Sequence, residues 1–134
     1  MRAVLDPNVI ISGLLSPTGT PANVLRALDQ GEFELVVSRT LLDELARALA
    51  YPKLRRHISP DDAVARWIGD SATTVTDPTQ QPPVHSTDPQ DDYLIALASS
   101  ERAALVSGDQ HLLDLTAAIP VFSPREFIEL LAAR

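Results

Sequence analysis

The chain has 134 residues, of which 45% are hydrophobic, and this common size for one compact domain leads us to expect a single domain over residues 1–134. It contains no cysteine, which excludes disulfides, thiolate metal sites and cysteine nucleophiles and fits a reducing compartment. Eighteen acidic and eleven basic residues give a formal charge of −7, which excludes a broadly basic surface for nucleic acid unless bound cations supply positive charge.

Short apolar runs alternate with helical patterns along the chain, as in a βαβ sheet. The first half predicts a strand at residues 3–5, a helix opening near Asn8, a helix from Thr20-Pro21 to Gly31, a strand at 33–37, a helix from Ser38 or Thr40 to about Ala50 and a helix from Ser59-Pro60 to about Ser71. The second half predicts a strand at 73–76, a helix from Asp88-Pro89, a strand at 104–107, a short helix with Leu112 and Leu113, a strand at 119–122 and a terminal helix capped by Ser123-Pro124. Residues 77–87, with three prolines, should form an exposed loop.

Several acidic residues fall close to the edge where ligands of parallel sheets bind, beyond the C-terminal ends of the strands. Asp6 ends the first predicted strand, and Asp109 follows the fourth. Asp91 and Asp92 lie in the first turn of the helix from Asp88, and periodicity does not separate them because the next six residues are all apolar. Each acid also has an ordinary role, as a helix cap or as a complement to the helix dipole. Their shared position in the layout is what indicates a site.

Helical geometry places a fourth acid. Glu44 borders the apolar stripe of its helix, beside Leu41 and Ala48, whereas Asp43 points to the polar side with Arg47. A glutamate in this position also fits an ordinary boundary role. With the other acids, Glu44 completes a predicted cluster of carboxylates.

The carboxylates of such a cluster either bind divalent cations or repel one another. Mg²⁺ and Mn²⁺ prefer carboxylate and water oxygens, and two such ions about 4 Å apart stabilise the attacking and leaving oxygens of a phosphodiester displacement. Asn8 is placed to bind water or substrate there, and Ser107 to orient the Asp109 carboxylate. The three histidines have no spacing typical of a zinc site.

Four segments carry a family resemblance. They are Val-Leu-Asp-Pro-Asn-Val at 4–9, Leu-Asp-Glu-Leu at 42–45, Asp-Pro-Gln-Asp-Asp-Tyr-Leu-Ile-Ala-Leu-Ala at 88–98 and Val-Ser-Gly-Asp-Gln-His-Leu-Leu at 106–113. Together and in this order they resemble the four sequence blocks of PIN domains, and most closely those of the VapC-like toxins of bacterial type II toxin-antitoxin modules. The resemblance continues into the terminal helix and covers essentially the whole chain.

The resemblance implies a three-layer α/β/α sandwich with a central parallel sheet. The implied catalytic and metal-binding residues are Asp6, Glu44, Asp92 and Asp109, with Asn8, Ser107 and Asp91 in support. Asp92 is preferred over Asp91 because the string Asp-x-Leu-Ile-Ala begins at Asp92. Pro7 stands where many family members have a hydroxyl residue, so an oxygen contact from that position is lost here.

The resemblance also implies Mg²⁺- or Mn²⁺-dependent ribonuclease activity, homodimerisation and inhibition by a cognate antitoxin protein. We therefore expect an endoribonuclease toxin that hydrolyses RNA phosphodiesters and leaves 5′-phosphate and 3′-hydroxyl ends. No apolar run is long enough for a membrane span, and Asp6 comes too early for a signal peptide, so we expect a cytoplasmic protein without membrane association.

Two other functions compete with this hypothesis. A catalytically silent PIN-like module would bind protein or RNA without cleaving it. A receiver-type signalling domain also gathers acids and Mg²⁺ on a parallel sheet, but it needs a lysine after its last strand. The single lysine, Lys53, lies between two predicted helices, which disfavours the receiver.

Overall fold

The computed structural model describes residues 1–57 and 61–134 and contains a five-stranded parallel sheet. The strands are β1 (Arg2–Leu5), β2 (Glu34–Val37), β3 (Ala72–Thr74), β4 (Ala104–Val106) and β5 (Val121–Phe122). Their order across the sheet is β3-β2-β1-β4-β5, so β1 is central and pairs with both β2 and β4. The predicted α/β fold with a central parallel sheet is confirmed.

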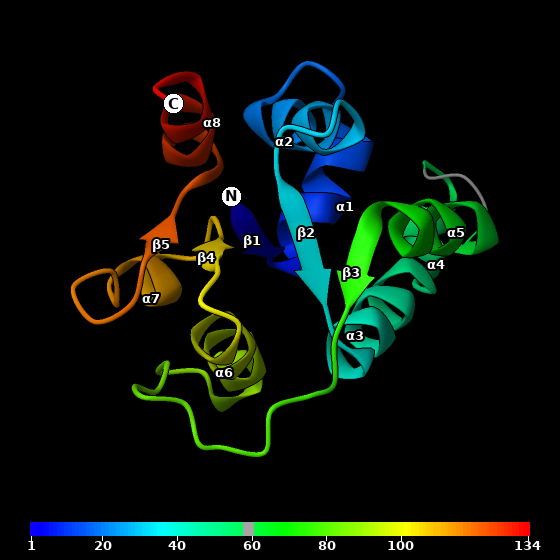
Figure 1. The fold of residues 1–134 in the computed structure, drawn as a ribbon. Coiled ribbons are helices and arrows are strands. Elements are labelled where there is room, and N and C mark those ends of the chain that lie inside the picture. Colours follow the sequence, from blue (N-terminus) through cyan, green and yellow to red (C-terminus); the bar gives the residue numbers. More distant parts are fainter. Residues whose placement is uncertain (58–60) are drawn as a thin grey trace.

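Helices flank this sheet (Figure 1). They are α1 (Pro7–Leu15), α2 (Thr20–Asp29), α3 (Arg39–Leu49), α4 (Pro52–Arg55), α5 (Asp61–Ser71), the 3₁₀ turn η1 (Pro89–Asp91), α6 (Asp92–Ser100), α7 (Gln110–Leu113) and α8 (Pro124–Ala132). Figure 1 shows α1 and α2 on one side of the central strands and α6 on the other, where α6 packs against β1 and β4. Helix α3 contacts both α1 and α6. Among the described residues, no helix has the length and apolar character that a membrane crossing requires.

The helix starts follow the capping chemistry expected from the sequence. Ser38, Asp88 and Ser123 each accept a hydrogen bond from a backbone N–H of the first turn that follows them. Ser123 forms a full capping box with Glu126, in which each side chain satisfies the other residue's backbone N–H. Helix α2 differs, because its N-cap is Gly19 and not Thr20.

Three details differ from the predicted layout, and one prediction falls outside the described residues. Helix α4 was not predicted, because four residues are too few to show a helical period. Strand β5 is shorter than expected, because only its last two residues pair with β4. A 3₁₀ turn separates Asp88 from α6. The expected cap at Ser59-Pro60 lies outside the described residues.

The strand order explains where a site forms. The chain leaves β1 toward β2 and β3, whereas it leaves β4 toward β5, so successive connections diverge between β1 and β4. This topological switch point opens a crevice beyond the C-terminal ends of the two strands. Residues such as Leu5, Leu105 and Ile95 are fully buried beneath it, so the crevice stands on a packed core.

We expect opposite effects from alanine at two helical glycines. A Cβ at Gly13 would lie 2.6 Å from Leu25 Cδ1 and 3.0 Å from the Pro21 carbonyl oxygen, whereas a Cβ at Gly69 would meet no atom within 4 Å. Helix propensity favours alanine by roughly 1 kcal/mol at either position, but overpacking costs about 1–3 kcal/mol. Urea unfolding should therefore show Gly69→Ala more stable than wild type and Gly13→Ala less stable. Equal stabilisation of both variants would contradict the tight packing of α1 on α2.

Candidate functional site

Asp6 and Asp109 lie next to each other in the crevice because β1 and β4 pair in register, with Leu5 opposite Val106. Ser107 joins the two acids. Its Oγ–H donates to Asp6 Oδ2 at 2.9 Å, and its Oγ accepts the backbone N–H of Asp109 at 3.0 Å. Ser107 was expected to orient the Asp109 carboxylate, but it orients the Asp6 carboxylate and the Asp109 backbone, because its hydroxyl points across to β1.

Among the acidic residues predicted for the site, Asp6 is the most buried, with an exposure of 5%. Its Oδ1 accepts the Asn8 backbone N–H at 3.0 Å and so caps α1. Burial raises the pKa of Asp6, the hydrogen bonds from Asn8 and Ser107 partly oppose this, and the negative charge of Asp109 raises it further. The helix-capping role and the clustering of acids therefore coexist in one side chain.

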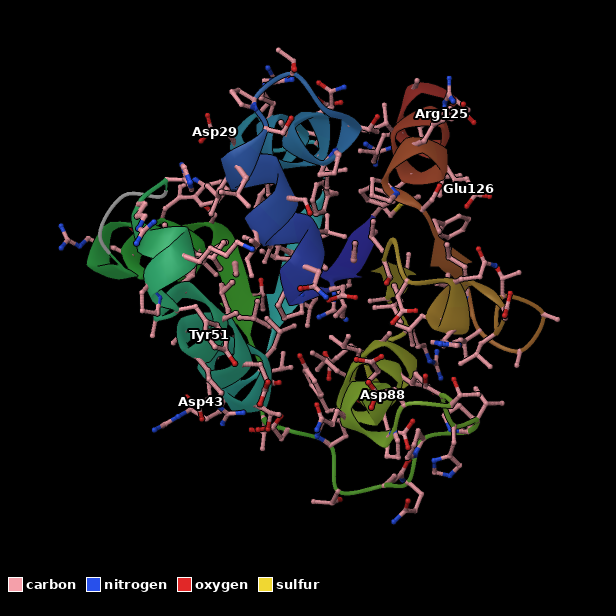
Figure 2. All side chains as sticks on the ribbon, turned by 180° about the vertical axis from the view of Figure 1, so that it is seen from behind. Asp29, Asp43, Tyr51, Asp88, Arg125 and Glu126 are labelled. Carbon is pink, nitrogen blue, oxygen red and sulfur yellow. The ribbon has the colours of Figure 1, made fainter. Side chains whose placement is uncertain are left out.

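Asp91 belongs to the same cluster and reaches it from η1. Burial, the negative charges of Asp6, Asp88 and Asp109, and a hydrogen bond with the Asp109 carboxyl raise the pKa of Asp91 to about 6. Figure 2 shows Asp88 beside α6, at the start of this segment. Every influence on Asp91 acts in the same direction, so the described residues supply no compensating positive charge to it.

Asp92 has a different environment from Asp91. Its Oδ1 accepts the Ser86 backbone N–H at 2.8 Å, and its Oδ2 lies 2.7 Å from Nδ1 of His85. Burial acts to raise the pKa of Asp92, but these two hydrogen bonds outweigh it and the pKa is lowered. Asp92 thus fastens the end of the 77–87 loop to α6, while Asp91 acts on Asp6 and Asp109.

Glu44 lies at the margin of the cluster. Its side chain is 39% exposed, and Oε1 accepts a hydrogen bond from Arg47 at 2.6 Å, so Glu44 is paired along α3. Its neighbour Asp43 pairs with Arg39 at 3.4 Å, and Figure 2 shows Asp43 at the outer side of the helix, as predicted.

Tyr93 is a member of the site that sequence reasoning counted only as an apolar residue. Burial raises its pKa first, and the charges of Asp6, Glu44 and Asp91 raise it further. The phenol therefore lies within electrostatic reach of acids from β1, α3 and η1 and stays protonated, as a neutral donor, at neutral pH. Its position directly after Asp91-Asp92 is the signal that could have found it.

A pocket of about 340 Å³ adjoins the acids on the α1 side. It is lined by Asp6, Asn8, Val9, Ser12, Pro21, Gly108, Asp109 and Pro124. Asn8 is exposed at the start of α1 and lines this pocket. A molecule in the pocket would touch the cluster at Asp6 and Asp109.

The donor set suits a hard divalent cation. Asp6, Asp91 and Asp109 are oxygen ligands of the kind that Mg²⁺ and Mn²⁺ prefer, and their mutual repulsion calls for positive charge. Within residues 1–57 and 61–134, no three acidic or histidine side chains are already grouped closely enough to hold an ion. Binding would therefore require these like-charged side chains to converge.

Comparison with known proteins identifies the class. A sequence model described as PIN domain matches residues 2–111, most of the chain, so the chain belongs to the PIN domain family. The predicted family is confirmed. A curated relative, the uncharacterized protein MJ1680 of Methanocaldococcus jannaschii, is 26% identical over 141 aligned residues that cover 96% of this chain and 90% of the relative.

Two crystal structures share the fold. One chain of VapBC2 from Rickettsia felis, bound to a DNA fragment from their promoter, matches with a TM-score of 0.63 and 13% identity over 92% of this chain and 98% of that one. PAE2754 from Pyrobaculum aerophilum matches with a TM-score of 0.63 and 16% identity over 100% of this chain and 91% of that one. At such identities the likeness shows the fold.

The raised pKa of Asp91 leads to a pH-dependent stability without metal. The folded chain keeps this proton up to about pH 6, whereas the unfolded chain loses it near pH 3.8, so the free energy of unfolding falls as pH rises between these values. Asp91→Asn should remove this fall and gain on the order of 1 kcal/mol at pH 7, after allowance for solvent screening. Urea unfolding in EDTA between pH 4 and pH 7 tests this, with Asp43→Asn as a surface control. An unchanged pH slope in Asp91→Asn would refute the assignment.

Proposed function

We propose that the protein is a Mg²⁺- or Mn²⁺-dependent endoribonuclease. The observation that carries this proposal is the uncompensated cluster of Asp6, Asp91 and Asp109 at the switch point of a PIN-family sheet. Carboxylates that repel one another beside a pocket reduce the stability of the fold. Cation binding would relieve this repulsion, so a metal site is a functional reason for the cluster. The proposed ligands are these three acids, with Glu44 joining them if it leaves Arg47.

The chain's own residues prepare the site in several ways. The backbone N–H of Asn8 and the Ser107 hydroxyl fix both oxygens of Asp6, so this carboxylate is preorganised. Tyr93 places a neutral phenol near the acids, and its O–H is a donor that a nearby anionic oxygen can use. When bound, Mg²⁺ or Mn²⁺ supplies the positive charge that offsets the substrate phosphate and polarises the phosphodiester.

We extend the proposal to a toxin whose partner is an antitoxin protein, in a homodimeric and cytoplasmic assembly. The fold shared with a chain of VapBC2, together with the PIN-family sequence blocks, supports this context. A short open reading frame directly upstream would add support. Co-expression of its product should then suppress any growth defect that this chain causes.

The acids of the cluster should be essential for cleavage, and Asp92 should not be. Loss of a residue that only hydrogen-bonds a metal ligand already lowers metal affinity or activity by about 10–100-fold. We therefore expect Asp6→Asn, Asp91→Asn and Asp109→Asn each to lower the cleavage rate by roughly 100-fold or more. Asp92→Asn should cause a much smaller loss, because Asp92 holds the 77–87 loop. The assay incubates purified chain, free of partner, with total RNA in Mg²⁺ or Mn²⁺, with EDTA as control.

The outcomes separate the candidate functions. Cleavage that needs metal and Asp91 but tolerates Asp92→Asn supports the proposed site. The reverse order of sensitivity would restore the assignment made from the sequence string. Metal binding without cleavage of any RNA would favour the catalytically silent binding module.

Metal should also stabilise the fold, because it binds the folded cluster and relieves its repulsion. At concentrations several times the dissociation constant, Mg²⁺ should raise Tm by roughly 3–6 °C. Asp91→Asn should start from a higher Tm at pH 7 and gain less from Mg²⁺, since one ligand and one repelling charge are gone. Differential scanning calorimetry with and without Mg²⁺ measures both shifts. A wild-type Tm indifferent to millimolar Mg²⁺ and Mn²⁺ would argue against the metal site.

A further inference from the structure

The pocket beside the acids is placed where a neighbouring part of a bound nucleic acid would lie. It shares Asp6 and Asp109 with the cluster, while Asp91 belongs to η1 on the α6 side. A phosphodiester held at the acids would therefore direct one of its two attached nucleosides into the pocket. At about 340 Å³, the pocket is at the small end of the range of roughly 300–1,000 Å³ for ligand sites, which suits a single nucleoside.

The polar groups of the pocket are neutral apart from the two shared acids. Asn8 and Ser12 are four residues apart on α1, so both lie on the same face of the helix, and both are exposed. The described lining includes no lysine or arginine, and Asp6 and Asp109 would repel a phosphate placed deep within it. The pocket therefore suits an uncharged part of a nucleotide.

The remaining wall is apolar. Pro21 from α2, Pro124 from α8 and Val9 from α1 complete it. A nucleoside combines flat apolar base faces with sugar hydroxyls, which matches proline and valine surfaces beside an amide and a hydroxyl. The 2′-hydroxyl is both donor and acceptor, as are the Ser12 hydroxyl and the Asn8 amide, and it is the group that distinguishes RNA from DNA.

We propose that this pocket binds the nucleoside next to the cut phosphodiester and that Ser12, with Asn8, recognises its 2′-hydroxyl, so that RNA is favoured over DNA. The proposal rests on the ribonuclease function and names the part of the chain that reads the sugar. Ser12 acts in substrate binding and selection, while the acids carry the chemistry. Because Ser12 is exposed, its hydrogen bond is a modest one, which amounts to about 3–10-fold in affinity.

The test uses Ser12→Ala, which removes only the hydroxyl. Ser16→Ala is the matched control, because Ser16 is the exposed C-cap residue of the same helix and does not line the pocket. Ser12→Thr keeps a hydroxyl and should behave like wild type. Two probes with the same bases are compared, a short random-sequence RNA pool and a uracil-containing DNA pool of equal length.

Two readouts separate this inference from the proposed function. Fluorescence anisotropy, with Ca²⁺ as the divalent cation, measures the Kd of each pool and so gives the ratio of the DNA Kd to the RNA Kd. Cleavage is measured in separate assays with Mg²⁺. We expect the wild-type Kd ratio to be about 3–10 and to fall toward one in Ser12→Ala but not in Ser16→Ala. In cleavage, Ser12→Ala should raise KM for RNA by a similar factor and leave kcat nearly unchanged, because the contact is made equally in ground and transition states.

The failures are distinguishable. If wild type does not cleave RNA but shows the Kd ratio and loses it in Ser12→Ala, the sugar-reading pocket stands and the nuclease proposal fails. If wild type cleaves RNA but Ser12→Ala keeps the full Kd ratio, the pocket assignment is overturned and the nuclease stands. A wild-type ratio of one, or no RNA binding, overturns the assignment as well.

Discussion

The buried carboxylate of Asp6 is the group on which both the site and the centre of the fold depend. Asp6 directly follows the central strand β1, caps α1 and accepts a hydrogen bond from the hydroxyl of Ser107, which directly follows β4, so three elements meet at one side chain. An ionised group at 5% exposure is costly unless it is compensated, and its neighbours Asp91 and Asp109 add repulsion. Its two hydrogen bonds offset part of this cost. The remainder is the physical argument for a bound cation.

Much of this arrangement could be predicted from the sequence because it depends on local rules. Buried strands read as short apolar runs, and caps such as Ser38 and Ser123 mark helix starts. Asp6 and Asp109 could be placed because Asp6 directly follows a strand and Asp109 comes three residues after the end of another. The different surroundings of Asp91 and Asp92 could not be predicted, since they depend on where the 77–87 loop returns and presents Ser86 and His85 to one of the two carboxylates.

A net charge of −7 is compatible with a nucleic-acid substrate in this geometry because the acids and the uncharged part of the pocket occupy different parts of the surface. Acids gather in the crevice, where a cation would reverse the local sign. The adjoining pocket is polar but uncharged apart from the two acids at its edge, so it suits a sugar and base better than a phosphate. Long-range attraction is then not the main source of affinity, and short-range contacts would have to supply more of it.

Asp91 stays close to Asp6 and Asp109 in spite of their repulsion because α6, the helix that directly follows Asp91, is firmly anchored. Leu94, Ile95 and Leu97 of α6 are at most 1% exposed and pack into the core beneath β1 and β4. Burial of each such side chain contributes roughly 1.5–3 kcal/mol, so the three together exceed the repulsion of about 4 kcal/mol expected of a carboxylate pair in contact near the surface. The nearly all-round apolar character of α6, because of which periodicity does not separate Asp91 from Asp92 in the sequence, is therefore also what holds Asp91 near Asp6 and Asp109. Stability of the scaffold and instability of the site are two consequences of the same segment.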